Sequence, residues 1–219
     1  MPFSPDIEQA GNTMRTALRK AHEQVKDEAL GGKASVTAVK IIDNDSERTA
    51  VIGSVGKTRA YLFRNETLER ITRDHGIGLL EKYTDKHGRE IILEETVIEA
   101  MDAVRTGIDL REFRQKKFGP YPGRDIWRHR EHVRFSVGSS LPQNLTIYEV
   151  PLEAKDTMLV VSEGIQNLSR GELTHSLRAH YRNPAEPIVS MAIGIATTKQ
   201  HARSFPADFT AVAVQVNER

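Results

Sequence analysis

Short runs of β-branched residues, separated by polar turns, most constrain the fold of this chain. The first run, ASVTAVKII, covers residues 34–42, and TAVIGSV follows at 49–55. Residues 55–64 and 68–72 are predicted to form the two arms of a hairpin around the polar residues 65–67. This succession predicts four strands in an antiparallel meander, of which the first, rich in β-branched residues, would be buried on both faces.

Helical periodicity and further strands surround this meander. Apolar residues recur at helical spacing from Ile7 to Val25, which predicts one amphipathic helix over residues 6–29. Helices are also predicted over 76–107, with a turn at His87-Gly88, and over 163–199, the latter broken at Gly171 and at 183–184. No repeat or linker interrupts the pattern, so we expect a single α/β domain of the α+β type over residues 1–219. The remaining predicted strands cover 133–138, 145–150, 157–162 and 209–216.

The composition bounds the class of protein. Hydrophobic residues make up 38% of the 219 residues and charged residues 28%, which is the balance of a globular protein. The net charge of +1 gives no overall attraction to nucleic acid or to membranes. The absence of cysteine excludes disulfides, thiolate nucleophiles and cysteine-ligated zinc. No apolar run of signal-peptide or transmembrane length occurs, so we expect a cytoplasmic protein without a membrane partner.

Residues 111–134 differ in composition from the rest of the chain. They contain eight Lys or Arg residues against three Asp or Glu, with aromatic residues interleaved and Pro-Gly turns in the middle. Such a segment is typical of an exposed, flap-like insertion, which could be a solvated loop or could bind an acidic protein or nucleic acid. The near-neutral charge of the whole chain argues against nucleic acid. The side chains that would carry binding are Arg111, Lys116, Lys117, Trp127, Arg128 and Arg130.

Five short motifs occur in a fixed order along the chain. Ser-Val-Gly-Lys-Thr-Arg-Ala-Tyr-Leu at 54–62 is followed by Ile-Thr-Arg-Asp-His at 71–75 and by Val-Gly at 137–138. Asp-Thr-Met-Leu-Val-Val-Ser-Glu-Gly-Ile at 156–165 and Ala-Asp-Phe-Thr-Ala-Val at 207–212 close the series. In this order and spacing the chain resembles the metal-dependent (PPM, type 2C) protein serine/threonine phosphatases over nearly its whole length. The resemblance implies a sandwich of two antiparallel β-sheets flanked by helices, and we expect the family's N-terminal strands to be missing here.

The chemistry implied by the resemblance is altered at the metal-binding positions. Members of the family hydrolyse phosphate monoesters with two Mg²⁺ or Mn²⁺ ions, which need carboxylate ligands. Here Lys57 replaces an Asp, Glu163-Gly164 replaces Asp-Gly, and Ala207-Asp208 replaces Asp-Asn, a shift that would make Asp208 face the other side of its strand. The family's upstream Asp-Gly segment is also expected to be absent. At most Glu163 would remain as a metal ligand, so we expect no metal cofactor and no catalytic residues.

Arg59, Asp74 and His75 occupy the other family-equivalent positions. Adjacent Asp and His side chains rarely face each other, so an acid–base pair is the weaker interpretation, and Asp74 is expected to cap a helix. Arg59 is expected to hold a carboxylate inside the fold. Glu163 is expected to stabilise the first turn of a helix if it binds no ion.

These observations predict a pseudophosphatase, a catalytically inactive relative of the phosphatases that acts in binding or regulation. One alternative is an active phosphoprotein phosphatase, with Mg²⁺ or Mn²⁺, that another segment or chain completes. The other is a binding module for nucleic acid or an acidic protein through residues 111–134. Without the missing strands, 34–42 or 209–216 would expose a sheet edge, which we expect a homodimer or another protein partner to cover.

Overall fold

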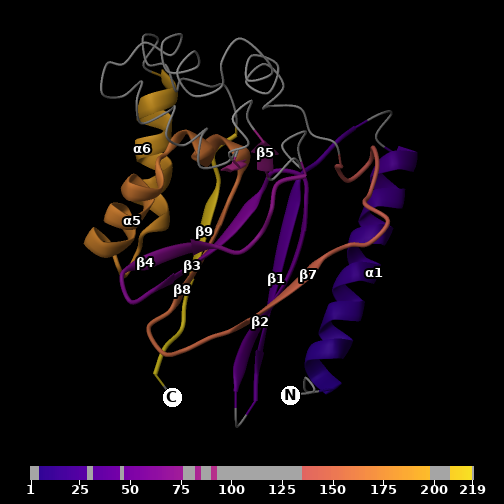
Figure 1. Ribbon diagram of the computed structural model, residues 1–219, viewed down its shortest axis with the longest axis horizontal. Coiled ribbons are helices and arrows are strands. Elements are labelled where there is room, and N and C mark those ends of the chain that lie inside the picture. Colours follow the sequence, from indigo (N-terminus) through magenta and orange to yellow (C-terminus); the bar gives the residue numbers. More distant parts are fainter. Residues whose placement is uncertain are drawn as a thin grey trace.

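The computed structural model describes residues 5–28, 32–44, 47–75, 82–84, 90–92, 135–197 and 208–218. Figure 1 shows four layers in these residues: the long helix α1, a three-stranded sheet, a four-stranded sheet, and the helices α5 and α6. All strand pairs in both sheets are antiparallel. The predicted sandwich of two antiparallel sheets flanked by helices is therefore confirmed.

Helix α1 (Pro5–Glu28) covers the outer face of the three-stranded sheet (Figure 1). Its apolar side chains, among them Ile7, Met14 and Leu18, are buried, while most of the residues between them are exposed, as the helical period predicted. Gly53 of the sheet permits the close approach of the helix, because a Cβ atom there would lie 2.6 Å from Cγ of Met14. The predicted first helix is thus confirmed.

The three-stranded sheet has the order β1-β2-β7 and consists of β1 (Val36–Asp43), β2 (Arg48–Val55) and β7 (Ile147–Pro151). The central strand β2 is almost entirely buried, whereas β1 lies at the edge and is only partly buried. The prediction that this first strand is buried on both faces is wrong. Its outer face stays partly open because α1 lies mainly over β2.

The four-stranded sheet has the order β4-β3-β8-β9 and consists of β3 (Arg59–Arg64), β4 (Thr67–Arg70), β8 (Thr157–Val161) and β9 (Ala211–Gln215). The β3–β4 hairpin turns at Asn65 and Glu66, whose φ angles are 48° and 61°. These angles lie in the left-handed region that a tight two-residue hairpin turn requires. The predicted hairpin is confirmed, with Thr67 already in its second strand.

The chain changes sheets between β2 and β3, at residues 56–58. Gly56 has a φ of 97°, and a Cβ atom there would lie 2.2 Å from Oγ of Ser35. Only glycine allows this turn without a clash, and the turn carries β3 away from β2. The predicted meander of four strands is therefore wrong, because the four strands form two hairpins that belong to different sheets.

The outer face of the four-stranded sheet is covered by helices α5 (Arg170–Ala179) and α6 (Ala185–Thr197), which follow the short 3₁₀ helix η2 (Glu163–Asn167). The predicted break of the 163–199 helix near residues 183–184 is confirmed. The other break falls before Gly171 rather than at it, because Ser169 and Glu172 form a capping box that starts α5.

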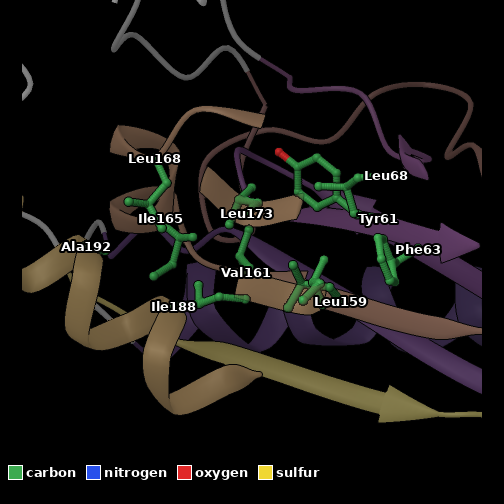
Figure 2. Packing of buried hydrophobic residues seen from close by; sticks show 11 residues of the cluster. Tyr61, Phe63, Leu68, Leu159, Val161, Ile165, Leu168, Leu173, Ile188 and Ala192 are labelled. Carbon is green, nitrogen blue, oxygen red and sulfur yellow. The ribbon is translucent and has the colours of Figure 1, made fainter. Parts of the chain in front are cut away.

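Apolar clusters lie on both faces of the four-stranded sheet. Figure 2 shows the outer cluster, in which Leu159 and Val161 of β8 pack with Ile165, Leu173 and Ile188 from the helical layer. A second cluster lies between the two sheets and includes Ile52 of β2, Leu62 of β3 and Met158 of β8. The four-stranded sheet is thus buried on both faces over β3 and β8.

Two further predictions are corrected. Part of the predicted helix 76–107 forms the antiparallel strands β5 (Lys82–Thr84) and β6 (Glu90–Ile92), whose tyrosine, threonine and isoleucines favour strands over helices. The predicted strand 133–138 is absent from the described residues 135–138, where only single bridges such as Ala34 to Val137 occur and Gly138, with φ 87°, turns the chain. Among the described residues, no helix is long and apolar enough to cross a membrane.

Candidate functional site

The candidate site lies at one end of the four-stranded sheet, where β3 begins and β8 ends. Arg59 pairs with Val161 in the antiparallel ladder, so the turn before β3 and the residues after β8 meet at the same end of the sheet. Lys57 belongs to that turn, and Glu163 is the first residue of η2. The ladder therefore brings together two residues that are 106 positions apart in the sequence.

Lys57 and Glu163 form an ion pair. Nζ of Lys57 donates a hydrogen bond to Oε1 of Glu163 over 2.6 Å, and the lysine side chain is only 4% exposed, against 30% for the glutamate. A buried ammonium ion is tolerated only with a carboxylate or comparable acceptor beside it. Glu163 thus serves as the counter-ion of a buried lysine.

The backbone of Lys57 is also fixed on both sides. Its N–H donates to Oγ of Ser35 over 3.0 Å, and its carbonyl oxygen accepts a hydrogen bond from Nε2 of Gln166 over 2.5 Å. Ser35 precedes β1 and Gln166 lies in η2, so this one residue connects the two sheets and the helical layer. These bonds fix the backbone from which the Lys57 side chain extends to Glu163.

Gly164 and Asp208 lie next to the ion pair through their backbones. A Cβ atom on Gly164 would lie 2.5 Å from the carbonyl oxygen of Asp208, so glycine is needed for this contact. Ser162 strengthens it, because its Oγ donates to the same oxygen over 2.7 Å and accepts from the N–H of Thr210 over 2.9 Å. Asp208 is exposed and precedes β9 by three residues, so the prediction that strand alternation turns it away does not apply.

The described residues of this site do not fit a divalent cation. Such an ion needs several oxygen ligands, chiefly carboxylates. Here the one carboxylate in contact with Lys57 is already bonded to its ammonium group, and the described ranges contain no group of three or more His, Asp or Glu side chains that could hold a metal. A cation at this site would need negatively charged ligands, and the positively charged Lys57 lies in the place of one.

A second charged cluster joins Arg59, Arg70 and Asp74. The guanidinium of Arg59 donates three hydrogen bonds to the two oxygens of the Asp74 carboxylate, the shortest over 2.5 Å, and Arg70 donates to Oδ1 of the same carboxylate over 2.8 Å. Burial alone would raise the pKa of Asp74, but the charges of Arg59, Arg70 and Lys57 and the bonds from Arg59 hold it below its usual value. Arg59 thus holds a carboxylate inside the fold, as expected.

His75 bonds to the turn that carries Lys57. Nδ1 of its ring accepts a hydrogen bond from the backbone N–H of Gly56 over 3.1 Å. The backbone N–H of His75 donates to the Gly56 carbonyl over 2.8 Å. Burial lowers the pKa of the imidazole, an effect that the negative charge of Asp74 only partly offsets. Since no hydrogen bond joins the Asp74 carboxylate to this ring in the described part of the chain, the two side chains form no acid–base pair.

The other predicted positions lie outside the described residues. They are Ala207, Trp127 and the basic residues Arg111, Lys116, Lys117, Arg128 and Arg130. The sequence prediction missed Arg70, Ser35 and Gln166 as contributors to the site. Arg70 carries a local signal, its i,i+4 spacing to Asp74, whereas the hydrogen bonds of the other two run between distant segments and leave none.

Comparison with known proteins supports the fold assignment. No protein-family model matches the sequence, and no curated protein matches it by sequence. The structure is similar to that of the serine/threonine phosphatase PstP/Ppp of Mycobacterium tuberculosis, with a TM-score of 0.55 and 18% identity over 93% of this chain and 69% of that one. It is also similar to the serine/threonine phosphatase Stp1 of Staphylococcus aureus, with a TM-score of 0.58 and 16% identity over 100% and 71% of the two chains.

A third similar structure is described as a PPM Ser-Thr phosphatase, MsPP from Mycobacterium smegmatis, in complex with cacodylate. Its TM-score is 0.53, with 14% identity over 92% of this chain and 70% of that one. At such identities the likeness concerns the fold and carries no statement about activity. The chain has the sandwich fold of the bacterial PPM-type serine/threonine phosphatases.

Proposed function

We propose that this protein is a pseudophosphatase, which has the PPM-phosphatase fold, does not hydrolyse phosphate esters and acts by binding or regulation. The observation that carries the proposal is the ion pair between Lys57 and Glu163, at 2.6 Å, in the place where the resemblance puts metal ligands. Metal-dependent phosphoryl chemistry requires carboxylates that bind the metal ions. Here the carboxylate of Glu163 is bonded to a buried ammonium group instead.

The size of the electrostatic penalty supports this proposal. One of the similar structures, the catalytic domain of the phosphatase PstP, is described in complex with two manganese ions. In the present chain, a divalent ion ~4 Å from the Lys57 ammonium would be repelled by about 8 kcal/mol at an effective dielectric of ~20. The ammonium group is buried and bonded to Glu163, and Ser35 and Gln166 hold the backbone of the same residue.

Phosphatase assays test the proposal directly. Turnover of p-nitrophenyl phosphate and of a phosphoserine peptide should stay at the level of the buffer in millimolar Mn²⁺ or Mg²⁺. The Glu163→Gln variant should give the same background rate as the unaltered chain. Manganese-dependent turnover that disappears in Glu163→Gln would show an active phosphatase and overturn the proposal.

A matched control separates the protein's own activity from that of a contaminant. Lys20 is an exposed residue of α1, so Lys20→Gln changes one charge outside the site. A contaminating phosphatase would give equal rates in the unaltered chain, Lys20→Gln and Glu163→Gln. An activity that belongs to this chain would persist in Lys20→Gln and be lost in Glu163→Gln.

A further inference from the structure

Strand β9 forms one edge of the four-stranded sheet in the part of the chain that the structure describes. It pairs with β8 on one side, and no described strand pairs with it on the other (Figure 1, yellow). The N–H of Ser162 bonds to the carbonyl of Thr210, and the N–H of Val216 to that of Asp156. In an antiparallel ladder these bonds direct the backbone groups of residues 210, 212, 214 and 216 toward β8. The N–H and C=O groups of 211, 213 and 215 therefore point away from the sheet.

The opposite edge of the same sheet is protected. At β4 the carbonyl of Leu68 accepts hydrogen bonds from the guanidinium of Arg170, and Glu69 and Arg70 place charges within the strand. β9 has the sequence Ala-Val-Ala-Val-Gln, without a proline or a charged residue. Natural proteins rarely leave such an edge unprotected, because it pairs readily with another chain.

Exposed apolar side chains gather around β9. Four large apolar side chains are exposed among the described residues, and two of them, Val212 at 52% and Val214 at 39%, lie on β9 itself. The third, Tyr181, belongs to a residue whose carbonyl accepts a hydrogen bond from the Gln215 side chain. The fourth, Ile193, lies on α6, the helix that packs against β9. This concentration at one edge is typical of an interaction surface.

We propose that β9 pairs antiparallel with β9 of a second copy of this chain, which joins the two four-stranded sheets into one. The strand is self-complementary about Ala213. With a two-fold axis there, Ala211 faces Gln215 of the second copy, and the free backbone groups of both strands bond to each other. Val212 then lies opposite Val214 of the second copy on the same face, so all four exposed valines come together.

The arrangement of charges also suits a second copy. Antiparallel pairing brings the C-terminal end of one β9, beside which Lys155 bonds to the Val216 carbonyl, to the N-terminal end of the other β9, which follows Asp208. Both Lys155 and Asp208 are exposed, so opposite charges of the two copies come to the same end of the joined strands. The chain's net charge of +1 sets no strong repulsion between copies. Because α6 covers β9, the same axis brings the α6 helices of both copies alongside each other, which enlarges the interface beyond two strands.

Light scattering after gel filtration tests this proposal on the full 219-residue chain. At tens of micromolar, the unaltered chain should have the mass of a dimer. Ala213→Pro removes an N–H that points to the free edge and costs no hydrogen bond among the described residues, so it should give a folded monomer. Ala213→Ser, which keeps the N–H group, should remain a dimer. Circular dichroism and melting temperature establish that each variant is folded.

A charge-swap experiment tests the register and does not depend on proline. A chain with Val212→Lys and Val214→Lys should be monomeric, and so should a chain with Val212→Glu and Val214→Glu. Mixed together, the two should form a heterodimer, because each lysine faces a glutamate across the axis. A monomeric unaltered chain, or dimers that persist in both Ala213→Pro and the double-lysine chain, would overturn the proposal. Neither result depends on whether the protein hydrolyses phosphate esters.

Discussion

Nζ of Lys57 lies 2.6 Å from Oε1 of Glu163, and the lysine side chain of this pair is almost completely buried. Removing the carboxylate alone leaves a buried ammonium ion without its counter-ion. Removing both charges leaves no such ion. The two residues should therefore contribute to stability as a unit, and their substitutions should not be additive.

A double-mutant cycle of the unaltered chain, Lys57→Met, Glu163→Gln and the double variant tests this coupling. We expect Glu163→Gln to lower the free energy of unfolding by about 2–3 kcal/mol, because it strands a buried charge. The double variant Lys57→Met/Glu163→Gln should recover at least ~1 kcal/mol of that loss in urea titrations. As a control, Glu66→Gln removes the charge of the exposed Glu66–Arg178 contact, away from β9, and should cost less than about 0.5 kcal/mol. Strict additivity would show that the pair does not act as a unit.

The response to divalent ions should depend on residue 57. Mn²⁺ should not raise the melting temperature of the unaltered chain beyond the effect of an ionic-strength control. Lys57→Asp removes the repelling ammonium and adds a carboxylate near Glu163, so a saturable, Mn²⁺-dependent rise in melting temperature is expected. Lys20→Asp makes the same charge change on the exposed side of α1 and should show no such rise. A metal-specific shift of the unaltered chain at micromolar Mn²⁺ would contradict this prediction.

The pH dependence of stability should report on His75. Burial lowers the pKa of this imidazole in the folded protein, so near and below pH 6.5 the unfolded chain binds a proton that the folded chain does not. Acidification from about pH 7.5 to about pH 5.5 should therefore lower the free energy of unfolding of the unaltered protein. The same acidification should lower the free energy of unfolding of the His75→Gln variant less. His175→Gln, at an exposed position of α5, should keep the slope of the unaltered protein. Equal slopes for all three proteins would refute the assignment.

Two glycines should respond to alanine with opposite signs. In Gly164→Ala the new methyl group would meet the Asp208 carbonyl at 2.5 Å, so the segment before β9 must shift, at a cost of about 1–3 kcal/mol. Gly194 lies inside α6, and a Cβ atom there would have no neighbour within 4 Å, so Gly194→Ala should stabilise by up to about 1 kcal/mol. Thermal melts of the two variants provide the measurement. A neutral Gly164→Ala would mean that this contact is not tight.

Local signals explain the successful sequence predictions. The amphipathic period of α1 and the turn residues Asn65 and Glu66 act over a few positions, so the helix and the β3–β4 hairpin could be predicted directly. The sandwich itself was predictable because motifs spread over the chain occur in a family-like order. The meander was wrong because the turn at Gly56 depends on Ser35, which lies on the far side of β1 and β2 in the sequence.

The site was only half predictable for the same reason. Lys57 and Glu163 were each recognised as departures from an acidic pattern, but their pairing depends on the β3–β8 ladder, which joins distant segments. Opposite charges at two positions that the resemblance brings together were the available signal. The arginine pair around Asp74 was half predicted, since Arg59 was expected to hold a carboxylate and Arg70 was not considered.

The two hairpins have a consequence for the order in which the protein can fold. β1 with β2, and β3 with β4, are complete once the chain has reached Arg70, but each sheet also needs a strand that begins at Ile147 or later. β8 must then insert between β3 and β9, so its partners come from opposite ends of the chain. During synthesis on the ribosome, we expect the two hairpins to form early. Strands β2 and β3 then lack their partners β7 and β8 until most of the chain has emerged. Chaperones that hold exposed strands would have their longest access to this protein in that interval.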